Sequence, residues 1–140
     1  MNWAAARATT AIAVVTAAVS LILILTGMVP DAAVAGGFIP LRFEGATLPP
    51  DFGFAVPTLL TPLSATLIHG GFAHIAFNLV MLVYCGAQTE RALGPRGIAI
   101  LYVVGAYAAA IAQYFPDPNS PMPMIGASGA ISAIVGKSVS

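Results

Sequence analysis

Two groups of residues in this sequence have the types and spacing that chemistry requires. The first is His69, His74 and Asn78, which lie in otherwise apolar sequence and include both histidines of the chain. The second is Ser128, a serine set between glycines in the run Gly-Ala-Ser-Gly. A serine nucleophile usually needs a base. If both histidines belong to the first group, none remains to activate Ser128.

The histidine group is open to a metal-binding and a structural interpretation. On a helix, His74 and Asn78 are one turn apart and share a face, whereas His69 is about 140° from His74. The pair also lacks the third ligand of a zinc site, so we expect no metal. Polar groups at membrane depth are costly and usually face a protein interior or a water-filled cavity. Interhelical hydrogen bonding that locks a bundle is the structural alternative.

Ser128 has a catalytic and a packing interpretation. Gly126 follows a proline-rich loop, so Ser128 is predicted to lie in the first turn of a new helix. The free N–H groups and the positive end of a helix favour an anion there, which suits the oxyanion of acyl transfer. The alternative is a helix of small residues that packs closely against a neighbour, with Gly129 and Ala133 one turn apart.

Composition places these residues in a membrane protein. The chain has 140 residues, of which 59% are hydrophobic and only 7% are charged, against about 25% charged in soluble domains. A bilayer core needs about 20 apolar residues of helix. We therefore predict one all-α domain over 1–140, a polytopic membrane helix bundle with three complete spans and the start of a fourth. The predicted spans are about 9–29, 62–86, 98–115 and, incomplete, 127–140.

The remaining composition excludes several classes of function. A single cysteine excludes an internal disulfide and any multi-cysteine metal site. A net charge of zero and the lack of a basic run argue against nucleic acid as a partner. The bilayer is the predicted partner, and the sequence sets no oligomeric state.

The segment before the second span is a long loop, 31–57, rich in glycine, proline and aromatic residues. Its aromatic residues predict a segment that rests at the membrane interface. The first span has a rival interpretation as a signal peptide, with Arg7 before an apolar core and cleavage at Ala33-Val34-Ala35. The length of the apolar run and the spans that follow favour the membrane span.

The distribution of arginine orients the chain. Arg7, Arg91 and Arg96 are three of the five cations, and they flank the first span and the turn between the second and third. Because cations concentrate on the cytoplasmic side, we expect a cytoplasmic N-terminus and place Ser128 just below the outer surface. No long targeting segment precedes the first span, which fits the plasma membrane of a bacterium, with an organelle membrane as the alternative.

Taken together, the histidine group and the Ser128 group indicate one protein family far more specifically than either group alone. In order, spacing and membrane context, residues of about 57–136 resemble the rhomboid family of intramembrane serine proteases. The motifs that carry the resemblance are His69-x4-His74-x3-Asn78, Glu90-Arg91-Ala92-Leu93-Gly94 and Gly126-Ala127-Ser128-Gly129-Ala130-Ile131.

The resemblance implies six core spans around a water-accessible cavity, and substrates that are transmembrane proteins cut near the membrane surface. It implies no metal and no diffusible cofactor. Ser128 would be the nucleophile of a Ser-His dyad, and His74 and Asn78 would help the Ser128 backbone N–H to hold the oxyanion. His69 would order the outer end of the cavity, and Gly126 and Gly129 would allow close backbone approach. Glu90 and Arg91 would belong to a structural turn.

The sequence departs from the family in two places. In the family the general base is a histidine of the sixth core span, and this sequence stops at Ser140. From Ser128 a helix rises only about 20 Å by that point. We therefore predict that the 140-residue chain alone is inactive. Ser132 stands where relatives commonly have an aromatic residue. The alternatives are a non-catalytic rhomboid-like protein that binds transmembrane segments and an unrelated helical membrane protein.

Overall fold

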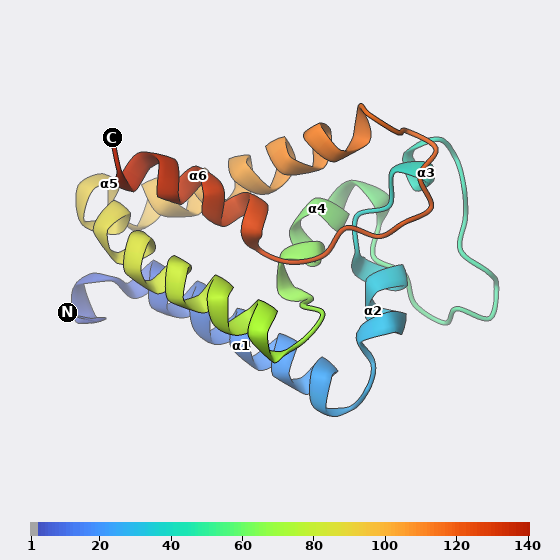
Figure 1. Cartoon of the computed structure of the whole chain (residues 1–140), viewed down its shortest axis with the longest axis horizontal. Helices are drawn as coiled ribbons and strands as arrows, with labels where there is room; N and C mark the ends of the chain where they lie inside the picture. The colour runs from blue at the N-terminus through green and yellow to red at the C-terminus, as the bar shows by residue number, and fades with distance from the viewer. Residues whose placement is uncertain (1–2) are drawn as a thin grey trace.

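The structure, a computed structural model, describes residues 3–140, and within them all regular elements are helices. This confirms the all-α fold class. Figure 1 shows α1 running beside the start of α5, with α6 against the later part of α5. The α-helices are α1 (Arg7–Leu25), α2 (Val29–Gly36), α3 (Pro40–Phe43), α4 (Thr61–Ser64), α5 (Phe72–Tyr114) and α6 (Ser128–Ser138), with 3-10 turns at Trp3–Ala5, Thr58–Leu60 and Ala65–Leu67.

The long helix α5 is a hairpin of two arms. Its backbone leaves the helical region at Gly94, where φ is 77° and ψ is 173°, and Pro95 follows. Glycine adopts positive φ at little cost, and proline cannot donate the backbone hydrogen bond that would continue the helix. The first arm (72–93) and the second arm (95–114) fold back on each other at this point (Figure 1).

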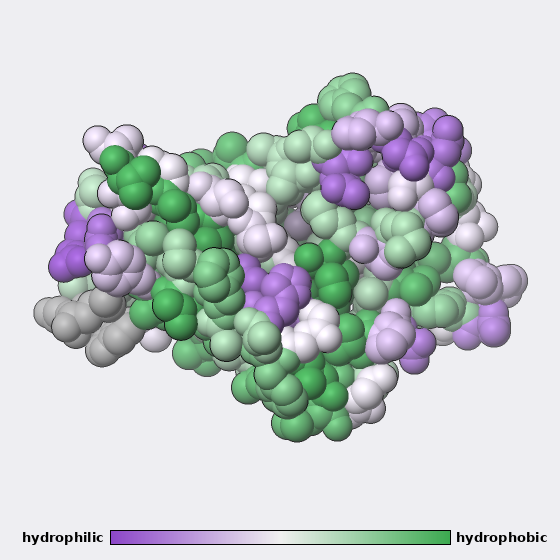
Figure 2. Space-filling model, viewed as in Figure 1, coloured by the Kyte–Doolittle hydropathy of each residue, from purple (hydrophilic) through white to green (hydrophobic). Residues whose placement is uncertain are grey.

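Two helices, α1 and α5, are long and apolar enough to cross a membrane by length and composition. Many of their large apolar side chains point outward, such as Leu25, Phe77 and Ile100, which are 74%, 67% and 64% exposed. Figure 2 shows hydrophobic residues covering much of this face of the molecule. Such a surface fits lipid better than water. The prediction of three complete spans requires each arm of α5 to cross separately, and it stays a prediction.

Helix boundaries differ from the predicted spans in two places. The first helix ends at Leu25, not near residue 29, because Gly27 takes a left-handed φ of 70°, a common way to end a helix. The segment 62–86 is not one helix. It begins with most of α4 and the 3-10 turn Ala65–Leu67, and its backbone leaves the helical region at Ile68 (φ −109°, ψ 125°). A continuous helix begins only at Phe72. His69 therefore precedes α5.

The loop 31–57 is partly helical, since most of α2 and all of α3 lie within it. Its aromatic residues do not share one environment, and the interfacial position of the loop stays a prediction. Phe38 is only 2% exposed, whereas Phe54 is 73% exposed. The Phe38 N–H donates to the Met124 carbonyl at 3.0 Å, and the Met124 N–H donates back at 2.7 Å. This isolated bridge ties the loop to the segment that leads to α6.

The core lies where α6 packs against both arms of α5. Leu82, Ile98 and Ile134, one from each of these segments, are fully buried there. The contact depends on small residues. A Cβ added to Gly129 would lie 2.3 Å from the Ala109 Cβ, within van der Waals overlap. The predicted close packing of small residues around α6 is therefore confirmed.

The N-terminus of α1 is capped by a residue of another helix. The carboxylate of Glu90, on the first arm of α5, accepts the N–H groups of Ala8 at 2.9 Å and Thr9 at 2.8 Å, and the Thr9 hydroxyl at 2.7 Å. A carboxylate satisfies the free N–H groups of a first helical turn and interacts favourably with the helix dipole. These bonds join α1 to the first arm of α5, and the assignment of α1 as a membrane span stays a prediction.

Candidate active site

The position of Ser128 is set by the loop that precedes it. Gly126 has a φ of 103°, which a glycine accepts readily, and its N–H donates to the Ala65 carbonyl at 2.8 Å. The next residue, Ala127, is fully buried, and α6 begins at Ser128. The predicted place of Ser128 in the first turn of a new helix is thus confirmed.

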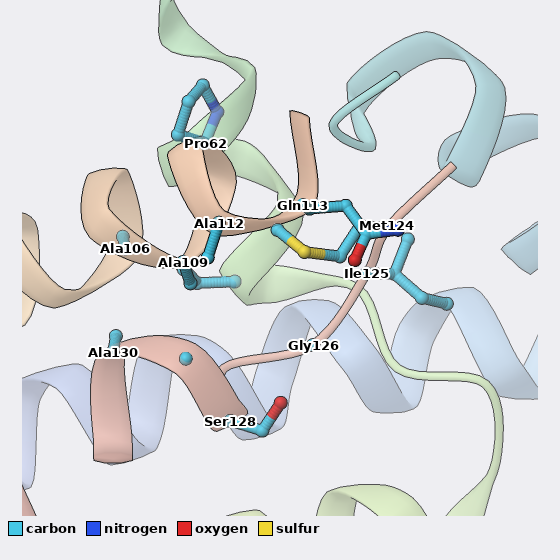
Figure 3. Close-up of a pocket in the computed structure, with 12 residues that line it drawn as sticks. Pro62, Ala106, Ala109, Ala112, Gln113, Met124, Ile125, Gly126, Ser128 and Ala130 are labelled. Carbon is cyan, nitrogen blue, oxygen red and sulfur yellow. The ribbon is translucent and has the colours of Figure 1, made fainter. Parts of the chain in front are cut away.

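Ser128 is exposed and lines two cavities. One, of about 290 Å³, lies between the start of α6 and the second arm of α5, and Gln113 and Thr66 contribute to its wall. The other, of about 270 Å³, lies between α6 and the first arm, and Asn78 and Ser132 contribute to it. Figure 3 shows the Ser128 side chain projecting from the first turn of α6, next to the loop at Gly126. The serine is therefore accessible from two sides.

His74 lies against the loop before Ser128. The Gly70 N–H donates to His74 Nδ1 at 3.3 Å, so a neutral His74 ring carries its proton on Nε2. The Nε2 atom would be 2.8 Å from a Cβ added to Gly126. Only glycine fits at position 126 beside this ring. Because Gly126 has no side chain, the Nε2–H of His74 lies next to the backbone of the loop before Ser128.

Asn78 is one turn further along α5 and only 3% exposed. Its Nδ2 donates to the His74 carbonyl at 2.8 Å, which leaves a second hydrogen of the amide free to donate. Asn78 and Ser128 line the same cavity. His74 and Asn78 share a face of the helix as predicted, and they approach the Ser128 region from the opposite side to the second arm.

His69 is fully buried and has hydrogen bonds at both ring nitrogens. Nδ1 lies 2.9 Å from Ser20 Oγ, and Nε2 accepts the Ala127 N–H at 3.2 Å. The predicted angle of about 140° to His74 is wrong, because it assumed one continuous helix. In the structure the two rings lie edge to face with their centroids 4.8 Å apart.

Metal binding finds no further support in this arrangement. Among residues 3–140, no group of three or more His, Cys, Asp or Glu side chains is placed to hold a metal ion. The two histidines, although close, already use three of their four ring nitrogens within the protein.

Ser20 is the residue near the site that sequence reasoning missed. It lies on α1, far from either motif, and is fully buried. A signal for it exists in the sequence, because the buried polar residues Thr9, Thr16 and Ser20 recur at helical spacing on one face of an apolar segment.

The comparison with known families finds a match over the part of the chain that holds these residues. The profile of the Rhomboid domain covers residues 57–140, which include both histidines, Asn78 and Ser128. The chain belongs to the rhomboid family. The apolar helices and this membership identify an integral membrane protein of the family of intramembrane proteases.

Curated relatives that carry the rhomboid name match about half of the chain. The chain is 37% identical over 78 residues to Rhomboid protease GluP of Bacillus subtilis, a match that covers 56% of this chain and 14% of the relative. It is 36% identical over 74 residues to Rhomboid protease GlpG of Haemophilus influenzae (53% and 37%). It is 30% identical over 78 residues to RHOMBOID-like protein 5 of Arabidopsis thaliana (56% and 25%). The chain thus spans well under half the length of these relatives, and no solved structure matches it.

Proposed function

We propose that this chain carries the nucleophile and oxyanion site of an intramembrane serine endopeptidase that cuts transmembrane proteins near the membrane surface. One observation carries the proposal. Ser128 opens α6 between two cavities, and the loop before it packs against His74. The rhomboid membership of residues 57–140 supports the same assignment.

The residues around Ser128 suit the reaction. In the first step Ser128 Oγ attacks the carbonyl carbon of the substrate peptide bond, and its proton passes to a base. The negative charge then moves to the carbonyl oxygen. Preorganised N–H donors at that oxygen stabilise such a transition state. His74 Nε2–H, the free amide hydrogen of Asn78 and the Ser128 N–H at the start of α6 are the donors we assign.

The second half of the reaction completes the hydrolysis. The C–N bond breaks, the base returns its proton to the leaving amine, and an acyl ester remains on Ser128. A water molecule, deprotonated by the same base, then attacks this ester and releases the acid and the serine. The openness of the Ser128 region to two cavities gives room for both the substrate and this water.

The base is assigned to a histidine outside residues 1–140. Within the described part of the chain, neither histidine forms a hydrogen bond with Ser128. His69 uses both ring nitrogens elsewhere, and the Nδ1 of His74 accepts a backbone N–H. We therefore expect the 140-residue chain by itself to be inactive. We assign the complete protein to the plasma membrane of a bacterium, with a cytoplasmic N-terminus.

Covalent labelling tests this function. The protein would be expressed from its native coding region, with whatever sequence follows codon 140, and treated with a fluorophosphonate or an isocoumarin. Mass spectrometry should locate the adduct on Ser128 and find none in Ser128→Ala, while Ser138→Ala at the other end of α6 labels normally. Labelling at another serine would overturn the assignment of Ser128 as the nucleophile, and no labelling with the protein folded would favour the non-catalytic protein that binds transmembrane segments.

A further inference from the structure

A buried serine of α1 contacts the active-site region through His69. Ser20 is fully buried, in a helix that is otherwise strongly apolar. A polar side chain at such a position needs a partner, and Ser20 has two. Its Oγ lies 2.7 Å from the Leu67 carbonyl oxygen and 2.9 Å from His69 Nδ1. Ser20 therefore joins α1 to the segment just before α5.

The two contacts of Ser20 fix the direction of its hydrogen bonds. A carbonyl oxygen can only accept, so the single hydroxyl proton of Ser20 goes to Leu67. The other contact must then be one in which Ser20 accepts, and His69 Nδ1 must carry a hydrogen. This sets the tautomer of His69 from the α1 side.

The opposite edge of the ring requires the same tautomer independently. The Ala127 N–H donates to His69 Nε2 at 3.2 Å, so Nε2 must present a lone pair. Ala127 is fully buried and directly precedes Ser128. If His69 carried its proton on Nε2, two donors would face each other at the residue before the nucleophile.

We propose that Ser20 is a positioning residue that acts on Ser128 through His69. His69 Nδ1–H donates to the Ser20 hydroxyl, and the Ala127 N–H donates to Nε2 on the far side of the same ring. This assignment rests on the proposed function for its catalytic meaning. The geometry stands without it, because each hydrogen bond is between described residues.

Removal of the hydroxyl gives a specific expectation. In Ser20→Ala the buried His69 Nδ1–H loses its acceptor, so the tautomer that receives the Ala127 N–H is held from one side of the ring only and becomes less favourable. A merely space-filling role for Ser20 would leave the tautomer unchanged. The matched control is Thr16→Val, one turn earlier on the same buried face. Among the described residues, the hydrogen bonds of His69 Nδ1 and of the Leu67 carbonyl go to Ser20 and not to the Thr16 hydroxyl.

The experiment is nitrogen NMR of the full 140-residue chain with 15N-labelled histidine in lipid nanodiscs. Only two histidines contribute, and His74→Ala assigns them. We expect His69 to be protonated on Nδ1 in the wild type and in Thr16→Val. In Ser20→Ala we expect this preference to weaken, with a measurable fraction of His69 protonated on Nε2, and the Ala127 amide to exchange about fivefold to tenfold faster, as for the weakening of one hydrogen bond.

Two results would overturn the proposal: a wild-type His69 protonated on Nε2, or a Ser20→Ala chain with unchanged tautomer and exchange. The wild-type measurement alone decides the first, even if the variant does not fold. Failure of the proposed function is separate, since it appears as missing labelling of Ser128 while the His69 tautomer stays as expected.

Discussion

The two histidines of this chain are neighbours in space with opposite hydrogen-bonding roles. His69 accepts at Nε2 and is enclosed by Ser20 and Ala127, whereas His74 accepts at Nδ1 and has its Nε2 beside Gly126. Because a neutral imidazole has one donor and one acceptor nitrogen, only His74 presents an N–H toward the Ser128 loop. His69 thus holds the loop before Ser128 in place, and His74 has an N–H that is free to bind an oxyanion.

Gly126 is the residue on which this arrangement most depends, and Gly126→Ala tests it. Its φ of 103° disfavours a side chain, and the new Cβ would lie 2.8 Å from His74 Nε2. We expect a loss of about 1–3 kcal/mol in the free energy of unfolding, since positive φ strains a residue with a side chain, together with lost labelling of Ser128. Denaturation by SDS in mixed micelles measures the stability.

The control is Gly136→Ala, the same substitution at a glycine whose surroundings are open. No atom lies within 4 Å of a Cβ added to this helical glycine, so stability should change by less than about 1 kcal/mol. Equal effects of the two substitutions would contradict the contact between Gly126 and His74.

At the scale of elements, two features bring the site together. The bend at Gly94 turns α5 back on itself, so that one arm supplies His74 and Asn78 and the other supports α6. The second feature is the glycine contact between α6 and the second arm, where Gly129 meets Ala109. Close approach of this kind replaces the hydrophobic driving force that helices lack in a bilayer.

An exchange of side chains tests the helix contact. Gly129→Ala alone should destabilise the protein by about 1–3 kcal/mol through overpacking, because its Cβ would lie 2.3 Å from the Ala109 Cβ. Ala109→Gly alone should cost about 0.5–1 kcal/mol through helix propensity. The double variant should recover part of the first loss, with a coupling of about 1 kcal/mol or more in a double-mutant cycle. Strictly additive effects would rule out the contact.

Sequence reasoning reached the helical class, the two motifs and the start of α6 at Ser128, because these follow from local pattern. It placed His69 inside a helix because an apolar run of this length resembles one continuous span. In the structure the chain reaches Phe72 through extended backbone at Gly71. Local pattern does not predict contacts between distant parts of the chain. Glu90 accepts a hydrogen bond from Thr9, 81 residues away, and Ser20 contacts His69, 49 residues away.

At the scale of the whole molecule, the proposal of an outward-facing active site rests on charge. Arg7 lies at the start of α1, and Arg91 and Arg96 flank the bend of α5. Figure 1 shows this end of the molecule opposite the loop that follows α2. With the cations in the cytoplasm, the loop and the start of α6 would face outward.

Cysteine labelling tests this orientation. The single cysteine, Cys85, is buried, and Cys85→Ala provides a background without thiols. In intact cells a membrane-impermeant maleimide should label Asp51→Cys in the exposed loop. It should label Arg96→Cys, exposed at the bend, only after the cells are permeabilised. The reverse pattern would mean that the chain is inverted and Ser128 lies on the cytoplasmic side.

The most direct test of the central claim is cleavage of a transmembrane reporter in liposomes by the protein expressed from its native coding region. We predict cleavage near the membrane surface that falls to background in Ser128→Ala, persists in Ser138→Ala and is absent with the 140-residue chain alone. Cleavage that continues in Ser128→Ala would contradict the assignment of Ser128 as the nucleophile. Ser128-dependent cleavage by the 140-residue chain would contradict a base from outside it.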